Sequence, residues 1–443
     1  MAVKLYHGDI VYTPSADTLA VYENSYIAVD SGKVEGIYPV IPEKYKHAEC
    51  IDYGRQMIIP AFSDLHVHGA QYVQRGIGMD CLLSDWLNNY TFPQESRLKD
   101  LSYAKKCYDA FVDDMICHGT FHANVFGTIH REATDYLFRK MEEKGMYGFV
   151  GKVNMDCNSP EFLIETTEDS LRETEIYLDS HTGSGKVKPI LAPRFAPTCS
   201  EKLMTGLGKL AAKYHCGVHT HLVESIWEAE EALRCFPGYH SDAEIYERAG
   251  LMDHGPSIFA HVIFPTEEDK RIMKKHGSFS VHCPDATTNI IAGIMPLAAM
   301  HDEELKIAIG SDVAGGHSIA IYKQIARAVQ LSKLKEFYEP DQSQTITLTQ
   351  AFYHATKEAG SVFGKVGSFE KGYQFNALVI DTMEDSWVPL TAEERLERFC
   401  YTDVTFINLS ATTVIYLSVY FYQSVSDHIF RFNPVLNHIC KFQ

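Results

Sequence analysis

The sequence lacks several features that secreted and nucleic-acid-binding proteins usually have. Its 11 cysteines include no C-x-x-C pair, so neither a disulfide framework nor a cysteine zinc knuckle is predicted. Basic residues are few: 40 Lys and Arg face 58 Asp and Glu, and the formal charge is -18. A nucleic-acid partner is therefore not expected, because phosphates are bound by clustered positive charge. The N-terminal stretch has no apolar run of signal-peptide length, so we expect a cytoplasmic protein that binds a small molecule.

The hydrophobic pattern changes near Pro60. Residues 3–60 contain short alternating segments separated by turn residues, which predicts a small antiparallel sheet. After residue 60, apolar strand-like runs are separated by segments with helical spacing, such as 203–215 and 226–236. This alternation is typical of the βα repeats of a parallel sheet.

Eight strand-like runs occur in this region, and eight parallel strands close into a barrel. They are residues 57–66, 120–128, 147–155, 188–195, 217–222, 257–263, 278–284 and 306–313. A later strand, at 371–381, is expected to return to the first sheet. We therefore predict an α/β fold: a (β/α)8 TIM-type barrel over residues 61–365 and a small β-sandwich domain built from residues 1–60 and 366–443.

Two His-x-His pairs lie at the ends of predicted strands. His66 and His68 end the first strand, and alternate residues of a strand point the same way, so both rings can share one metal ion. A second pair occurs at 219–221. Two such pairs are close to what chance supplies among 21 histidines, so the pattern alone is weak evidence for a metal site.

The positions of other polar residues strengthen this prediction. His221, His261 and Asp312 end the fifth, sixth and eighth predicted strands, and active sites of such barrels lie at the C-terminal ends of the strands. Each could instead be structural, as a hydrogen-bonded core histidine or a helix cap. Histidine and carboxylate ligands suit zinc, and iron(II) accepts the same types. Glu224, three residues after His221, could move protons at a metal-activated water or simply stabilise a helix N-terminus.

Several longer motifs resemble a known family. The stretches PAFSDLHVHGAQY, THLVES, FAHVIF and GSDVAGG resemble the amidohydrolase superfamily, and DWLNNYTFPQESR, VGKVNMDCN and APRFAPTCSE are similar to its guanine deaminase branch. The likeness covers residues 1 to about 399. It implies a homodimeric hydrolase that converts guanine to xanthine and ammonia in purine catabolism.

The same resemblance implies the roles of individual residues. It implies one zinc ion per chain, with the ligands His66, His68, His221 and Asp312. It implies catalytic roles for Glu224, His261 and Asp312. Substrate contacts are implied for Gln71, Arg194, Phe195 and His261.

Two other functions stay open at this point. The first is a related deaminase or chlorohydrolase that acts on another purine, a pyrimidine or a triazine. Such an enzyme would use the same metal ligands, so only Gln71, Arg194 and Phe195 distinguish it from a guanine deaminase. A barrel that has lost activity and serves as a scaffold would not need a complete set of ligands together with the acid.

The composition changes again at the C-terminal end. No glycine follows Gly372, and from Cys400 to Gln443 only four residues are charged: Asp403, Asp427, Arg431 and Lys441. Residues 404–426 are long enough to span a bilayer, but their many polar and β-branched residues make them a poor membrane helix, so we expect no anchor. We interpret the change as a shift of reading frame or gene model near residue 399. All predicted site residues precede it.

Overall fold

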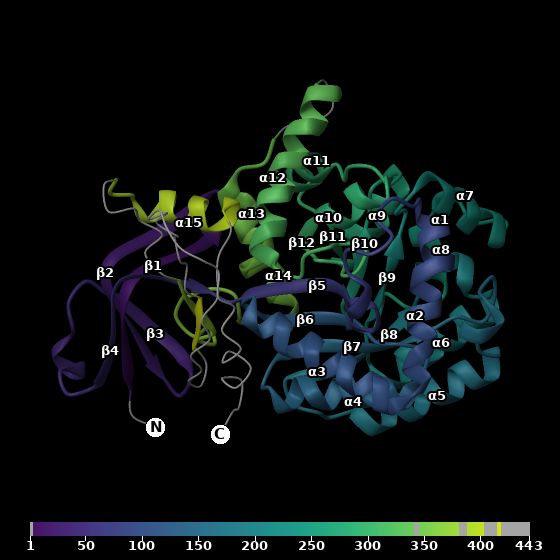
Figure 1. Cartoon of the computed structure of the whole chain (residues 1–443), viewed down its shortest axis with the longest axis horizontal. Coiled ribbons are helices and arrows are strands. Elements are labelled where there is room, and N and C mark those ends of the chain that lie inside the picture. Colours follow the sequence, from purple (N-terminus) through teal and green to yellow (C-terminus); the bar gives the residue numbers. More distant parts are fainter. Residues whose placement is uncertain (1–2, 341–344, 381–387, 403–413, 418–443) are drawn as a thin grey trace, which may run out of the picture.

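The computed structural model describes residues 3–340, 345–380 and 388–402, and the backbone of 414–417. Eight parallel strands form a barrel in chain order, which confirms the predicted (β/α)8 architecture (Figure 1). The strands are β5 (Phe62–His68), β6 (Thr120–Phe126), β7 (Tyr147–Asn154), β8 (Val187–Pro193), β9 (Val218–Leu222), β10 (Ser257–His261), β11 (Phe279–His282) and β12 (Lys306–Ile309).

Hydrogen bonds between the first and last barrel strands form the seam. The backbone N–H of Asp312, just beyond β12, donates to the carbonyl of His66 on β5 at 2.9 Å. The hydroxyl of Ser311 donates to the buried Asp64 carboxylate at 2.5 Å. The seam therefore places residues that are far apart in the sequence side by side.

Helices surround the barrel (Figure 1). Those after residue 100 are α3 (Leu101–Cys117), α4 (Arg131–Glu143), α5 (Thr167–His181), α6 (Glu201–Tyr214), α7 (Ile226–Cys235), α8 (Asp242–Arg248), α9 (Glu267–His276), α10 (Pro284–Asn289), α11 (Leu297–Asp302), α12 (Ile321–Tyr338), α13 (Leu348–Ala355), α14 (Lys357–Gly360) and α15 (Ala392–Tyr401). The predicted helices at 203–215 and 226–236 are α6 and α7, and the hydroxyls of Ser200 and Ser225 cap their first turns.

The connection from β5 to α3 is built from short helices. It comprises η2 (Gly69–Gln74), α1 (Leu83–Trp86), the π-helical turn η3 (Leu87–Thr91), α2 (Phe92–Ser96) and η4 (Arg97–Lys99). Further short 3₁₀ turns are η1 (Glu43–Tyr45), η5 (Glu161–Leu163), η6 (Ala196–Thr198) and η7 (Ser361–Phe363).

The second sheet takes strands from both ends of the chain. Its order is β14 (Val414–Leu417), β13 (Ala377–Ile380), β4 (Glu49–Pro60), β1 (Lys4–Ser15), β2 (Thr18–Asp30) and β3 (Lys33–Tyr38). The predicted return of the segment 371–381 is confirmed by the antiparallel pairing of β13 with β4. The domain boundaries at residues 60 and 366 stay a prediction.

Two details of the sequence-based prediction are wrong. The sheet is mixed, because residues 39–48 lead from β3 back past β1, and β4 then pairs parallel to β1. The first barrel strand is β5, whereas Met57–Pro60, which we predicted as its start, ends β4. Apolar residues lie on both sides of Pro60, so hydrophobicity alone does not separate the end of β4 from the start of β5.

Described residues near the C-terminal end contact this sheet. On α15, the fully buried Arg395 forms an ion pair with Asp9 of β1 at 2.5 Å. Apart from the backbone of β14, the expectation about the sequence after Thr402 lies outside the described residues. Within the described ranges, no helix is both long and apolar enough to cross a membrane.

Candidate metal centre

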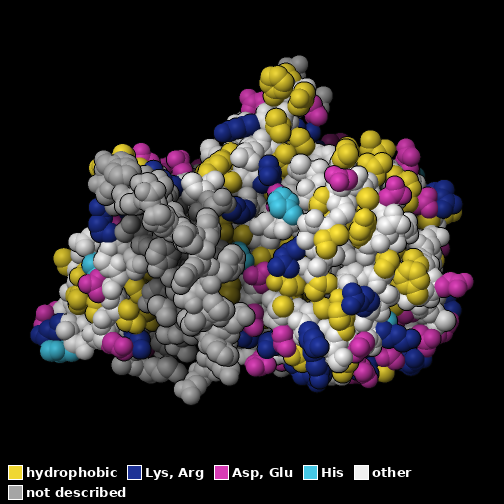
Figure 2. All heavy atoms as spheres, viewed as in Figure 1, with side chains coloured by type: hydrophobic (Ala, Val, Ile, Leu, Met, Phe, Trp, Pro, Cys, Tyr) yellow, Lys and Arg dark blue, Asp and Glu magenta, His cyan; other side chains and the backbone are white. Residues whose placement is uncertain are grey.

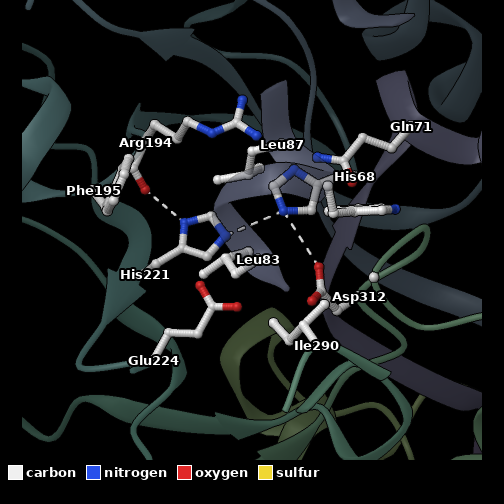
Figure 3. A pocket seen from close by; sticks show the side chains of 12 residues that line it. His68, Gln71, Leu83, Leu87, Arg194, Phe195, His221, Glu224, Ile290 and Asp312 are labelled. Atoms are coloured by element: carbon white, nitrogen blue, oxygen red, sulfur yellow. Dashed lines mark hydrogen bonds and ion pairs between the residues drawn. The ribbon is translucent and has the colours of Figure 1, made fainter. Parts of the chain in front are cut away.

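Four predicted ligands converge at the C-terminal end of the barrel. His66 and His68 come from β5, His221 from β9, and Asp312 from the turn after β12. The Nε2 atoms of His66 and His68 lie 3.2 and 3.4 Å from Oδ1 of Asp312. The Nε2 atoms of His68 and His221 are 3.2 Å apart (Figure 3). Ring nitrogens of all three histidines come within 4.8 Å of one another, which is close enough to share one ion.

Hydrogen bonding shows which ring nitrogens carry lone pairs. Nδ1 of His221 lies 2.6 Å from the carbonyl oxygen of Arg194, and a carbonyl can only accept, so Nδ1 carries the hydrogen. Nε2 of His221 is therefore the lone-pair atom. Nε2 of His66 is buried without a hydrogen-bond partner among the described residues. Buried lone pairs facing a carboxylate are stabilised by a cation, so these donors fit a metal ion.

Burial keeps the imidazoles in the form that binds metal. Desolvation lowers the pKa of His66 to about 3, and it lowers the pKa of His68 and of His221 well below the usual value. Neutral imidazole is the metal-binding form. Burial also raises the pKa of Asp312 well above its usual range, because the charged carboxylate is poorly solvated there. A bound cation would offset that cost.

The backbone leaves three strand ends in an unusual conformation. The φ angles are 44° at Val223, 73° at His261 and 44° at Asp312. Left-handed backbone at a non-glycine residue costs on the order of 1–3 kcal/mol and persists where the surroundings hold it. At Asp312 the holding contact is the N–H of Gly316, which donates to the Asp312 carbonyl at 2.7 Å. A Cβ at Gly316 would lie 1.9 Å from the carbonyl oxygen of Ser311, so the turn requires glycine.

A cavity of about 450 Å³, its opening included, lies over this cluster. Most of the predicted site residues line it: His68, Gln71, Arg194, Phe195, His221, Glu224 and Asp312 (Figure 3). Apolar side chains of the β5–α3 connection, Leu83, Trp86 and Leu87, line it as well. A flat apolar ring with polar edges would find both kinds of contact here.

His261 lies beneath the cavity and is fully buried. Its Nε2 is 3.5 Å from Oε1 of Glu224 and 3.7 Å from Oδ2 of Asp312. Burial, and then the charge of Asp312, raise the pKa of Glu224 to about 8. His261 thus lies close to Glu224 and Asp312, but it is not among the residues that line the cavity.

Four further buried residues, which were not predicted from the sequence, contact the site residues or their direct neighbour Val223. Nε2 of His219 lies 2.7 Å from Nδ1 of His66, where it orients a predicted ligand. Glu95 accepts hydrogen bonds from Gln71 and Arg194. Glu228 and Asp242 accept from the backbone N–H groups of Glu224 and Val223, at 2.9 and 3.2 Å. His219 had a signal in its His-x-His pair and Glu95 in the motif DWLNNYTFPQESR, whereas no quoted motif contains Glu228 or Asp242.

Known proteins resemble this chain in sequence and fold. Residues 57–416 match the amidohydrolase family. A guanine deaminase of Dictyostelium discoideum is 30% identical over 404 residues, which cover 86% of this chain and 89% of that protein. The structure of a guanine deaminase from C. acetobutylicum with bound guanine has a TM-score of 0.88 and 39% identity, covering 90% of this chain and 96% of that one. A zinc-bound adenosine deaminase from Xanthomonas campestris has a TM-score of 0.76 at 19% identity, covers 90% of this chain and 88% of that one, and shares the fold.

Proposed function

Because the chain belongs to the amidohydrolase family, we propose that it hydrolyses a C–N bond of guanine, releasing xanthine and ammonia. The observation that carries this proposal is the cavity itself. Gln71, Arg194 and Phe195 line it directly beside the cluster of histidines and Asp312. Donors for a purine edge, an aromatic ring for its face and a hydrolytic centre are thus within reach of one small ligand.

The metal in this proposal is one zinc ion held by His66, His68, His221 and Asp312. Nitrogen and carboxylate donors support zinc, although iron(II) suits the same ligands. Zinc at such a site lowers the pKa of a bound water to about 7, so hydroxide is available at neutral pH.

The reaction forms a bond between the water oxygen and C2 of guanine and breaks the bond from C2 to the amino nitrogen. Asp312 takes a proton from the attacking water and later returns it to Glu224, after Glu224 has protonated the leaving amine. Glu224 donates a hydrogen bond to a ring nitrogen, which makes C2 more electrophilic, and then passes a proton to the leaving amine. His261, 3.5 Å from Glu224 and 3.7 Å from Asp312, holds the attacking oxygen while it becomes bonded to the tetrahedral C2.

The cavity walls orient the purine ring. The guanidinium of Arg194 donates to the ring carbonyl, and Gln71 donates along the neighbouring edge. Phe195, whose ring centroid is 6.4 Å from that of His221, packs against the ring face. These contacts separate guanine from substrates that would use the same metal ligands.

A substrate panel tests the proposal. Purified protein supplied with zinc is incubated with guanine, adenosine, cytosine and a chlorotriazine, and release of ammonia or chloride is measured. We expect ammonia from guanine at a rate far above the others. Turnover of adenosine, cytosine or the triazine without turnover of guanine would assign the chain to another branch of the family, and no turnover at all would favour the scaffold.

We also propose that the protein is a cytoplasmic homodimer. Among the described residues, no disulfide bond joins two cysteines, as is usual in a reducing compartment. At the end of α12, Phe337 and Tyr338 are 76% and 74% exposed, and Figure 2 shows apolar side chains gathered on this projection. Exposed apolar side chains of this size favour association. Light scattering on the purified protein gives the oligomeric state, and a monomeric mass would contradict the dimer.

A further inference from the structure

Glu95 connects two side chains of the substrate cavity without lining it. It lies on α2 and is 2% exposed. Its Oε1 accepts a hydrogen bond from Nε2 of Gln71 at 2.8 Å, and its Oε2 accepts one from Nη1 of Arg194 at 2.7 Å. Gln71 follows β5 and Arg194 follows β8, which are not neighbours in the barrel. One buried carboxylate therefore sets the distance and orientation of two groups from separate strands.

The orientation of the Gln71 amide is determined by both of its neighbours. A carboxylate can only accept, so the amide nitrogen must face Glu95. The backbone N–H of Ala314 can only donate, and it lies 3.3 Å from Oε1 of Gln71, so the amide oxygen must face Ala314. One N–H of Gln71 is used by Glu95 and the second is left for a ligand. Figure 3 shows this nitrogen directed toward Arg194.

Arg194 is held in a similar way. Glu95 uses its Nη1, and its guanidinium carbon lies 5.1 Å from the ring centre of Phe92. Among the described residues, Glu95 is the one hydrogen-bond partner of this guanidinium, so further N–H groups are available to a ligand. Because Gln71 turns its oxygen away and arginine has no acceptor, this wall of the cavity offers donors only.

We propose that Glu95 is a positioning residue that makes the enzyme selective for an oxopurine. This inference rests on the proposed function and goes beyond it. A donor-only wall pairs with a purine edge that carries a carbonyl oxygen and an unprotonated ring nitrogen. An exocyclic amino group at the same edge would place its N–H groups against the N–H donors of Gln71 and Arg194, so a purine that carries one is rejected. Glu95 produces this selectivity without touching the substrate.

The test compares guanine with 2,6-diaminopurine, which has the same amino group at C2 but an amino group in place of the carbonyl at C6. The ratio of their kcat/KM values is measured by ammonia release, or from inhibition constants where turnover of the analogue is too slow. We expect Glu95→Gln to lower this ratio at least about tenfold, because a glutamine both donates and accepts and allows Gln71 to turn. Glu95→Asp keeps the charge and the acceptor-only character, so its ratio should stay nearer that of the wild type.

Two further variants separate selectivity from general damage. Glu165→Gln breaks another ion pair, the one between Glu165 and Lys152 at 2.7 Å, and neither residue lines the cavity. This variant should leave the ratio unchanged. Gln71→Met removes the amide that Glu95 orients. Adding Glu95→Gln to Gln71→Met should then change the ratio less than Glu95→Gln does alone.

The outcomes distinguish this inference from the proposed function. A wild type that does not deaminate guanine overturns the function. A wild type that does so, with an unchanged ratio in a folded Glu95→Gln variant, overturns the role of Glu95. If circular dichroism shows that Glu95→Gln is unfolded, Gln71→Met decides, and a wild-type ratio in a folded Gln71→Met variant would overturn the inference.

Discussion

Replacing Glu224 with glutamine is the sharpest test of the chemistry, because it removes a proton-carrying group and keeps the size of the side chain. Glu224 is 8% exposed, lines the cavity and lies 3.5 Å from His261. Of the described residues that line the cavity, only Glu224 and Asp312 carry carboxyl groups. Asp312 is a proposed metal ligand and already takes the proton of the attacking water, so the described lining offers no further carboxyl group to protonate the leaving amine.

The expected loss follows from this arrangement. One positioned acid or base contributes about 10²- to 10⁴-fold to a rate. Because Glu224 both polarises the ring nitrogen and protonates the leaving amine, we expect the upper part of that range, a fall in kcat of about 10³- to 10⁴-fold, or roughly 4–5.5 kcal/mol of activation free energy. Metal content should not change, because none of the four proposed ligands is altered.

The assay measures kcat by ammonia release from guanine and metal content by atomic emission on the same samples. Glu230→Gln is the matched control, because Glu230 is exposed on α7 and undergoes the same change of charge. It should retain wild-type activity. A Glu224→Gln variant with full metal content and a kcat within about tenfold of the wild type would refute the assigned role.

Three further predictions concern the metal and the stability of the fold. Dialysis against a chelator should abolish ammonia release and zinc should restore it, because the proposed chemistry depends on a metal-activated water; full activity in metal-free protein would contradict this scheme. Arg395→Met should cost about 3–5 kcal/mol in urea unfolding, because it leaves the buried Asp9 carboxylate unpaired. Adding Asp9→Asn should restore part of that stability, and an unchanged midpoint in the single variant would contradict the burial of the pair. Burial, and then the charge of Asp269, raise the pKa of Asp242 from 3.8 to about 8 in the folded state, so its contribution to stability is complete below about pH 4 and is lost as the pH rises through 8. Between about pH 5 and pH 8, the unfolding free energy of Asp242→Asn should therefore fall less than that of the wild type. The same fall in both proteins would refute the raised pKa of Asp242.

The barrel was predictable because its signal is local. Each strand is a short apolar run, and each helix repeats its apolar positions every three to four residues, so a few neighbouring residues are enough to recognise both. The same method failed between Met57 and His66, where one apolar run serves two sheets. Only the pairing partners divide it: β1 and β13 hold its first part, and β6 holds the second.

The predicted metal ligands were found for a similar reason. His66, His68, His221 and Asp312 each lie at or near the C-terminal end of a strand, and in a parallel barrel the ends of all strands meet at one rim. The strand order thus brought together residues that are far apart in the sequence, without any knowledge of side-chain contacts. The sequence could not show which ring nitrogen of His221 faces the centre of the site, because this depends on the carbonyl of Arg194.

The sequence by itself determined the barrel, the return of the chain to the first sheet, and the residue types that gather at the candidate metal centre. Tertiary structure alone decided the hydrogen-bonded partners of those residues. Glu95 contacts Gln71 and Arg194, which are 24 and 99 residues away, so no window along the sequence contains all three. Periodicity reports which face of an element is buried, whereas a hydrogen bond requires two particular atoms to meet, and that is fixed only when the strands and the connection between β5 and α3 pack together.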